Sequence, residues 1–229
     1  MSIASFLSIA VLALGASTSA AKCTNTFPSQ STDGGLLTTD PFGRNANDTN
    51  PVRKPYYFNK EGFLAFDPTG AKHPPIKAFF QTCTPNYARD SNDQSQQQQL
   101  YGRFYIPSIN KCLAVTNPSG KAPYYVATAD CPSAQDMTTA KSIPFNFMAA
   151  TEDDVDMRWV GNTIPSKNEF QSGCSRYAGQ LFVNATRLGY GWNSDGNGQP
   201  NTVAGGKEDY RVHLYCPNRT AVNDFVVPT

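Results

Sequence analysis

The chain has 229 residues, with 19 Lys and Arg against 18 Asp and Glu and a formal net charge of +1. No long basic stretch occurs, and this argues against nucleic acid or an anionic membrane as the main partner. Hydrophobic residues make up 39% of the sequence, enough to bury a sizeable core in one domain. A single domain after an N-terminal signal is therefore expected.

The chain opens with an apolar run, Met1–Leu14, that is followed by small residues up to Ala21. About a dozen apolar residues ending in small residues are typical of a secretory signal peptide and too short to span a bilayer. The sequence thus predicts a signal peptide at residues 1–21 and a secreted, extracellular domain at 22–229. Residues 225–229 lack the hydrophobic tail of a lipid anchor, so no membrane association is expected after the signal is removed.

Short segments rich in Tyr, Phe, Val and Thr alternate with Gly and Pro, which number 17 each. Long helical periodicity is absent. This spacing predicts an all-β protein with many short strands. The expected strands include residues 101–106, 112–115, 124–128, 157–160 and 181–183, with turns at 33–35, 67–70, 117–120 and 195–198.

Two short motifs alternate three times along the chain. A hydrophobic-Pro-Ser motif begins at Phe27, Ile106 and Ile164, and a closing strand begins at Phe79, Phe145 and Val212. This order indicates three sequential units at about residues 27–83, 106–149 and 164–216. The alternative is chance, because matches this short are common in a Pro-rich chain. Polar residues 92–99 predict an exposed, mobile insertion at about residues 87–100 within the same domain.

Six cysteines follow the signal segment: Cys23, Cys83, Cys112, Cys131, Cys174 and Cys216. An even number in a secreted chain predicts three disulfides, for which fifteen connectivities are possible. The preferred pairs are Cys23–Cys83, Cys112–Cys131 and Cys174–Cys216, because each lies within one of the three units. No CxxC pair occurs, so neither a structural zinc site nor a thioredoxin-like redox motif is expected.

Three Asn-x-Ser/Thr triplets, at Asn47, Asn184 and Asn218, are candidate N-glycosylation sites. Such triplets also arise by chance in polar loops. In a secreted eukaryotic chain we expect at least one of them to be glycosylated, and therefore to lie on the surface.

The strand Lys111–Val115, with Cys131 nineteen positions after Cys112, resembles the ricin-B-type β-trefoil lectins. In that family a KCL-x-V strand and a later cysteine commonly form a disulfide within one repeat, and this implies the Cys112–Cys131 pair. The resemblance covers about residues 100–150 directly and the threefold pattern loosely. It implies a β-trefoil-like fold of three irregular repeats, with a β-sandwich as the alternative. The whole chain is also similar to small secreted proteins of filamentous fungi.

The chain departs from the lectin pattern in two places. The Gln-x-Trp signature is missing, and its nearest equivalents are Phe145-x-Phe147 and Val212-x-Leu214. The acidic residue that holds sugar hydroxyls in that family corresponds to Ala114 here. The resemblance therefore implies the scaffold without that particular sugar site.

No catalytic residue, metal or cofactor is expected. The two histidines are His73, in a Pro-rich exposed turn, and His213, on an expected strand, and no Gly-x-Ser-x-Gly elbow is present. The acidic cluster Glu152–Asp156 has the oxygen ligands that Ca²⁺ prefers, but such clusters are more often solvated loops. Residues 193–198 imitate the start of a calcium loop, yet its twelfth position is Ala204 rather than Glu. A carboxylate pair for glycoside cleavage has no signature in sequence, so an enzyme stays a third possibility.

Aromatic residues beside Gly, Pro and Asn are the best candidates for a binding site. Flat apolar faces next to polar amides suit both sugar rings and protein partners, although alternating aromatics in strands usually fill the core. The candidate ligand-binding residues are Tyr190, Trp192 and Asn193, in an expected exposed loop, together with Tyr124 and Tyr125. The expected function is non-catalytic binding of extracellular or cell-wall carbohydrate. The alternative is an inhibitor or effector that acts on an extracellular protein, and the oligomeric state is left open.

Overall fold

The computed structural model confirms an all-β protein in which every strand pairing is antiparallel. The residues that it describes are 20–38, 55–67, 69, 71–88, 100–120, 124–149, 156–161, 191–192, 202–203, 210–215 and 225–226. In this part of the chain, no helix is long and apolar enough to cross a membrane.

Within the described residues the regular structure consists of fourteen strands and two short 3-10 helices. The elements are β1 (Lys22–Phe27), β2 (Gly35–Leu36), β3 (Tyr57–Phe58), β4 (Leu64–Ala65), β5 (Lys77–Thr84), β6 (Leu100–Ile106), β7 (Lys111–Val115), β8 (Tyr124–Ala129), η1 (Asp136–Thr138), η2 (Ala140–Phe145), β9 (Phe147–Ala149), β10 (Asp156–Trp159), β11 (Gly191–Trp192), β12 (Thr202–Val203), β13 (Arg211–Tyr215) and β14 (Phe225–Val226).

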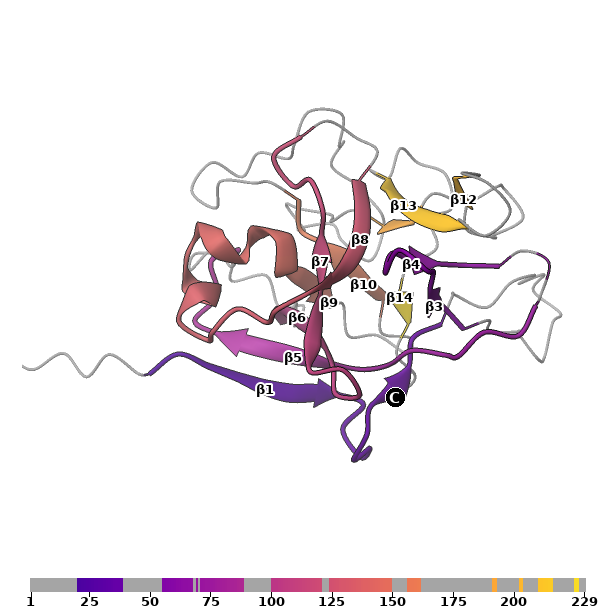
Figure 1. Cartoon of the computed structure of the whole chain (residues 1–229). Coiled ribbons are helices and arrows are strands. Elements are labelled where there is room, and N and C mark those ends of the chain that lie inside the picture. Colours follow the sequence, from indigo (N-terminus) through magenta and orange to yellow (C-terminus); the bar gives the residue numbers. More distant parts are fainter. Residues whose placement is uncertain are drawn as a thin grey trace, which may run out of the picture.

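Six of these strands form one row in chain order, which we call the six-strand row. β1 pairs with β5, β5 with β6, β6 with β9, β9 with β10, and β10 with β14 (Figure 1). No pairing between β14 and β1 occurs in the described part of the chain, so the row is open. The row therefore joins segments from both ends of the sequence through short antiparallel contacts.

Among the remaining strands, β2 pairs with β5 of the row, and the others form hairpins that meet at β13. β7 pairs with β8, β3 pairs with β4, and β11 and β12 both pair with β13. β13 also pairs with β8, and Arg211 in β13 pairs with Ala65 in β4 (Figure 1). The sequence predicts residues 212–216 as the closing strand of the third unit. Here that strand lies among the hairpins, whereas β14 occupies the end of the six-strand row.

Most expected strands appear within one residue of their predicted bounds, as β6, β7, β8 and β10. The strand predicted from Phe145 begins two residues later, because the preceding segment is the 3-10 helix η2. Pro144 lies inside this helix, and the hydroxyl of Thr139 accepts a hydrogen bond from the backbone N–H of Lys141 at its start. The expected strand at residues 181–183 lies outside the described residues.

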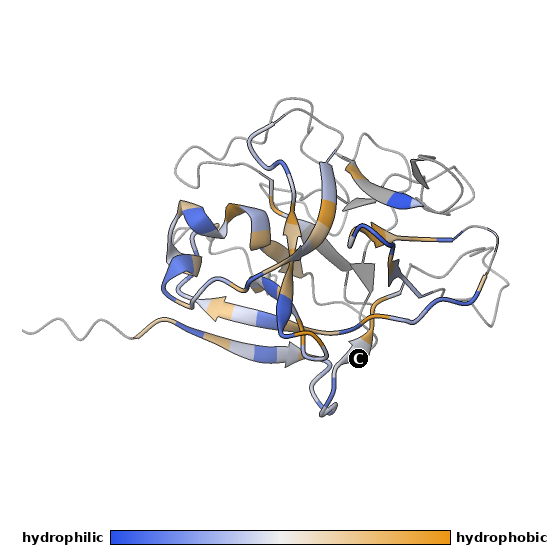
Figure 2. Cartoon of the chain, viewed as in Figure 1, coloured by the Kyte–Doolittle hydropathy of each residue, from blue (hydrophilic) through white to orange (hydrophobic). Residues whose placement is uncertain are grey.

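Aromatic side chains hold the six-strand row together. In β6, Phe104 and Ile106 are buried, while the alternate residues Arg103 and Tyr105 are partly exposed, as the two-residue period of a strand dictates. The ring of Phe104 meets Phe80 of β5 at 5.7 Å between centroids and Phe147 of β9 at 5.0 Å, both edge to face. Figure 2 shows hydrophobic residues recurring along the central strands. The core therefore links three strands that are distant in sequence.

Two disulfides join the cysteines that the sequence pairs within the first and second units. Cys23 of β1 is bonded to Cys83, its register partner in β5, and Cys112 of β7 is bonded to Cys131 after β8. A disulfide typically stabilises a fold by about 2–4 kcal/mol, mainly by restricting the unfolded chain. Cys174 and Cys216, the third expected pair, lie outside the described residues.

Several further predictions fall on parts of the chain that are not described. They are the signal segment up to residue 19, the triplets at Asn47, Asn184 and Asn218, and residues 89–99 of the expected insertion. The edges of that insertion are structured. Ala88 is 4% exposed, and its N–H donates to Asn86 Oδ1 at 2.9 Å; at the other edge, β6 begins at residue 100.

Candidate functional site

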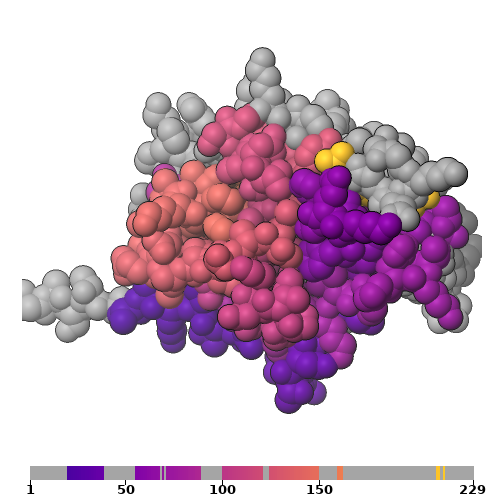
Figure 3. Space-filling view, in the orientation of Figure 1, coloured from indigo at the N-terminus to yellow at the C-terminus, as the bar shows by residue number. Residues whose placement is uncertain are grey.

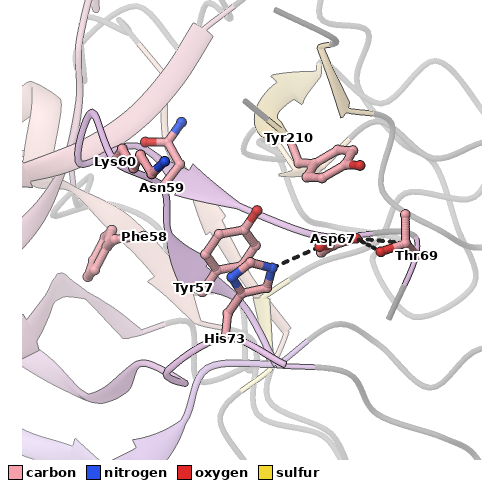
Figure 4. A pocket seen from close by; sticks show the side chains of 8 residues that line it. All are labelled: Tyr57, Phe58, Asn59, Lys60, Asp67, Thr69, His73 and Tyr210. Carbon is pink, nitrogen blue, oxygen red and sulfur yellow. Dashed lines mark hydrogen bonds and ion pairs between the residues drawn. The ribbon is translucent and has the colours of Figure 1, made fainter. Parts of the chain in front are cut away.

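A cavity of about 400 Å³ opens beside the β3–β4 hairpin (Figure 4). Its walls combine aromatic rings with a carboxylate, an imidazole, an amide, a hydroxyl and an ammonium group. The lining residues are Tyr57, Phe58, Asn59, Lys60, Asp67, Thr69, His73 and Tyr210. In the space-filling view, the purple β3–β4 segment lies against the yellow β13 segment at one end of the molecule (Figure 3). The cavity therefore forms where the first and last parts of the fold meet.

A tight turn positions the aromatic wall. The Oδ1 atom of Asn59 accepts hydrogen bonds from the backbone N–H groups of Glu61, at 3.1 Å, and Phe63, at 2.9 Å. Gly62 completes the turn with φ of 81°, a conformation that favours glycine. Asn and Gly are the residues that such turns require, so the local sequence folds this hairpin and places Tyr57 and Phe58 beside the cavity.

A second turn orients the carboxylate of Asp67. Its Oδ1 atom accepts hydrogen bonds from the backbone N–H of Thr69, at 2.8 Å, and from the Thr69 hydroxyl, at 2.6 Å. The backbone N–H of Phe66, next to Asp67, donates to the carbonyl of Tyr210 at 3.0 Å. This bond brings the Tyr210 ring from a distant part of the sequence to the cavity.

The imidazole of His73 makes two contacts in the cavity. Its Nε2 atom lies 2.8 Å from Asp67 Oδ2, and because an ionised carboxylate only accepts, Nε2–H is the donor. Its ring stacks on Tyr57 with 3.7 Å between centroids and 7° between planes. The side chain of Asp67 is 7% exposed, whereas that of His73 is 32% exposed. His73 thus covers part of the cavity from the solvent side.

The environment of Asp67 keeps its carboxylate ionised. Burial raises the pKa of Asp67, but the hydrogen bonds from Thr69 and His73 together outweigh this effect, so the pKa lies below its ordinary value. At neutral pH the cavity therefore contains a fixed negative charge beside aromatic rings.

We expect Asp67→Asn to reduce the acid sensitivity of the fold. A carboxyl whose pKa is lower in the folded than in the unfolded chain stabilises the fold above its ordinary pKa of 3.8. That contribution is lost as the pH falls through the folded pKa. Urea denaturation of both proteins between about pH 7 and 2.5 should show wild type losing more unfolding free energy than the variant. Curves that stay parallel would contradict the assigned role of Asp67.

Two other carboxylates with lowered pKa values, Asp33 and Asp136, do not affect this comparison. The Asp33 pKa is lowered mainly by its hydrogen bond from Lys77, and the Asp136 pKa mainly by its hydrogen bond from Ser133. Both carboxylates are present in wild type and in Asp67→Asn, so their acid titration contributes equally to the two curves.

Among the residues predicted to bind a ligand, Tyr124 is a core residue. It is 2% exposed, its ring lies 5.1 Å from that of Trp159, and its hydroxyl donates to the carbonyl of Gly120 at 3.0 Å. Its ring is therefore buried and is not accessible to a ligand. Tyr124 follows the alternative expectation, in which aromatic residues in strands fill the core. Tyr125 is partly exposed, but it faces Phe63 and the guanidinium of Arg211 rather than the cavity.

The predicted loop around Trp192 contains a strand instead. Gly191 and Trp192 form β11 and pair with Tyr215 and Leu214 of β13. Leu214 also pairs with Tyr124 on the other side, so backbone pairing across β13 lines up Trp192 and Tyr124. The sequence could not reveal this strand because the pairing partner is distant. Tyr190 and Asn193 lie outside the described residues.

Several cavity residues belong to features that the sequence predicts, but the sequence does not predict that these residues meet in one site. Asp67 and Thr69 are expected only as part of a turn, and His73 only as part of a Pro-rich turn. The six-residue spacing between Asp67 and His73 was the available signal, because a turn between them can return the imidazole to the carboxylate. No local sequence pattern predicted that Tyr210 lines the cavity.

Thr69 carries the only Ser, Thr or Cys side chain among the described lining residues, and its hydroxyl already donates to Asp67. In the described residues no group of three His, Cys, Asp or Glu side chains is arranged to hold a metal ion.

Comparison with known proteins gives no match: no protein-family model matches the chain, and neither does a curated protein or a solved structure.

Proposed function

We propose that this chain is a secreted, non-catalytic binding protein that recognises extracellular or cell-wall carbohydrate at the cavity around Asp67. The observation that carries the proposal is an ionised, oriented carboxylate that faces aromatic rings inside a cavity of about 400 Å³. Small-molecule sites commonly have volumes of roughly 300–1,000 Å³, with a few placed polar groups in largely apolar walls. The cavity has the size of such a site, and its lining is richer in polar groups.

The chemistry of Asp67 matches the hydroxyl groups of a sugar. A carboxylate accepts about four hydrogen bonds, two at each oxygen. Thr69 supplies two of them at Oδ1 and His73 supplies one at Oδ2, and this leaves one acceptor direction at Oδ2 among the described contacts. A sugar hydroxyl that donates there forms a charge-assisted hydrogen bond, which is stronger than a neutral one.

Aromatic rings supply the second half of sugar recognition. Phe58 and Tyr210 line the cavity and are both partly exposed. The C–H faces of a sugar ring are apolar and pack against flat aromatic surfaces, while its hydroxyls reach the polar groups around them. The cavity offers both kinds of surface within the reach of one small saccharide.

The scaffold that we propose is β-trefoil-like. Support comes from the six-strand row, in which β1 and β5, β6 and β9, and β10 and β14 are successive antiparallel pairs. Three groups of hairpin strands lie outside this row, and β13 connects them. This arrangement agrees with three units, each of which supplies two strands to the row and a hairpin beside it. Secretion is supported by the N-terminal apolar run and by two disulfides, which persist in oxidising compartments.

The test is co-sedimentation of the purified protein with chitin, β-glucan and mannan, together with a glycan array. We expect saturable binding that Asp67→Asn weakens at least about tenfold, since a hydrogen bond to a charged group contributes about 1.5–3 kcal/mol. Asp33→Asn is the matched control because Asp33 is also a hydrogen-bonded carboxylate but lies outside the cavity. Equal binding by wild type and Asp67→Asn would remove the cavity as the site.

Trp192→Ala separates the cavity from the ligand site predicted around Tyr190 and Trp192. Loss of glycan binding in Trp192→Ala, with Asp67→Asn unaffected, would move the proposed site to β11. If no glycan binds at all, the carbohydrate proposal fails.

A protein partner is the second candidate, with the chain as an inhibitor or effector. Leu36 in β2 and Ile109 in the β6–β7 turn are large hydrophobic side chains that are 41% and 46% exposed. Side chains of this kind can form the apolar part of a contact with a protein partner. Retention on insoluble polysaccharide separates the two candidates, because an inhibitor or effector would not be retained.

A further inference from the structure

The imidazole of His73 makes the two contacts that a bound sugar would make. It lies flat on the ring of Tyr57, with 3.7 Å between centroids and 7° between planes. Its Nε2–H donates to Asp67 Oδ2 at 2.8 Å. A sugar held between an aromatic ring and a carboxylate uses the same pair of contacts, one apolar face and one donated hydrogen. His73 therefore covers the face of Tyr57 and one acceptor direction of Asp67 Oδ2, both of which a bound sugar would use.

The segment that carries His73 lies outside the regular secondary structure and on the surface of the core. Residues 71–76 form no regular secondary structure, and Lys72, Pro74 and Pro75 are exposed. The segment is anchored at Ile76, which is 4% exposed; its N–H donates to Tyr56 at 3.2 Å and its carbonyl accepts from Leu37 at 2.8 Å. The His73 side chain itself is 32% exposed, so its departure uncovers the cavity rather than the hydrophobic core.

We propose that His73 is a built-in competitor of the carbohydrate ligand, and that the sugar binds by displacing its imidazole from Tyr57 and Asp67. This inference rests on the proposed function. When only a fraction of the molecules has the binding-competent arrangement, the apparent affinity falls by that fraction. His73 thus sets the affinity of the site by limiting how often the face of Tyr57 is open.

Two substitutions separate a competitor from a residue that merely positions Asp67. His73→Ala removes both contacts and leaves the Tyr57 face open. His73→Phe removes the hydrogen bond but keeps an aromatic ring over Tyr57. Calorimetric titration with soluble hexasaccharides of chitin, β-glucan and mannan should show His73→Ala binding about tenfold more tightly than wild type, equivalent to about 1.4 kcal/mol. His73→Phe should bind no more tightly than wild type.

Weaker binding by the His73 variants would contradict the competitor role. If His73→Ala and His73→Phe both bind more weakly than wild type, His73 positions Asp67 and the competitor role is overturned. If wild type binds and Asp67→Asn does not, the proposed function stands whichever way the His73 variants behave. If neither wild type nor His73→Ala binds any of the three sugars, the proposed function fails and the competitor role fails with it.

An NMR titration of the wild-type protein tests the same displacement without a substitution. The chain has two histidines, and His73→Ala identifies the imidazole signals of His73. Saturation with the hexasaccharide that binds should move these signals toward those of a free histidine, because the ring leaves the shielding face of Tyr57. Signals that stay in place at saturation would overturn the proposal.

Discussion

Gly102→Ala is expected to abolish cooperative folding. Gly102 lies in β6 and is the register partner of Thr82 in β5. A Cβ atom at this position would lie 1.8 Å from the carbonyl oxygen of Gln81 and 2.8 Å from the carbonyl carbon. A glycine inside a strand often marks such a close approach of another backbone. The atoms in the way are backbone atoms, so no side-chain rotation can relieve the overlap.

The surroundings prevent the two strands from separating. β5 pairs with β1 and is bonded to it through Cys23 and Cys83, while β6 also pairs with β7 and β9. We expect a loss of more than about 4 kcal/mol, a large part of the total stability of a typical domain. Urea denaturation followed by circular dichroism measures this loss, and the yield of folded protein on expression gives an independent readout.

Gly120→Ala is the matched control for Gly102→Ala. Gly120 lies in the turn after β7, where a Cβ atom would meet atoms of Asn117 at 3.2 Å or more. We expect a cost of at most about 1 kcal/mol, within the usual range for a surface substitution or a small adjustment. Equal stability losses in the two variants would show that the close approach of β5 and β6 is not the cause.

The second large effect is expected from Phe104→Ala. Phe104 is fully buried, and its ring lies between Phe80 of β5 and Phe147 of β9. Removing it leaves a cavity that the three strands of the six-strand row cannot close, because β6 is paired on both sides. Phe→Ala changes in cores cost about 3–5 kcal/mol. We expect a loss in this range, measured as the free energy of unfolding in urea.

Two further variants define the origin of that loss. Phe104→Leu retains most of the volume and should cost less than about 1.5 kcal/mol. Ile109→Ala changes a side chain that is 46% exposed and should change stability by no more than about 0.5 kcal/mol. A Phe104→Ala loss no greater than that of Ile109→Ala would mean that the aromatic contacts around β6 do not stabilise the core.

Local sequence patterns predicted the strands well because strand formation depends on residues close in the chain. The aromatic-rich residues 101–106 and the KCLAV segment predicted β6 and β7 within one residue of their bounds. Turn chemistry worked for the same reason: the backbone N–H of Thr69 donates to the Asp67 side chain, in the segment where the sequence predicts a turn. The disulfide partners Cys112 and Cys131 lie at the two ends of one hairpin, so local order sufficed there too.

Predictions that needed distant partners were less successful. Tyr124 was chosen as a ligand residue from its neighbours, but packing on Trp159 makes it a core residue. The sequence around Trp192 predicted a loop, because the two-residue strand β11 is recognisable only from its pairing with β13. Phe145 ends a 3-10 helix because of the local geometry around Pro144, which a pattern based on β-propensity does not detect.

The sequence by itself determined the all-β class, the turn at Asp67 and the Cys112–Cys131 disulfide, because each depends on residues that are near in the chain or on β-propensity. Only the tertiary structure decided the candidate site. The Asp67 carboxylate, the Tyr57 ring and the Tyr210 ring meet because β13 pairs with β4 and the Phe66 N–H bonds to the Tyr210 carbonyl. These contacts join residues that are more than a hundred positions apart, and their free energy comes from pairing and packing that no local pattern encodes.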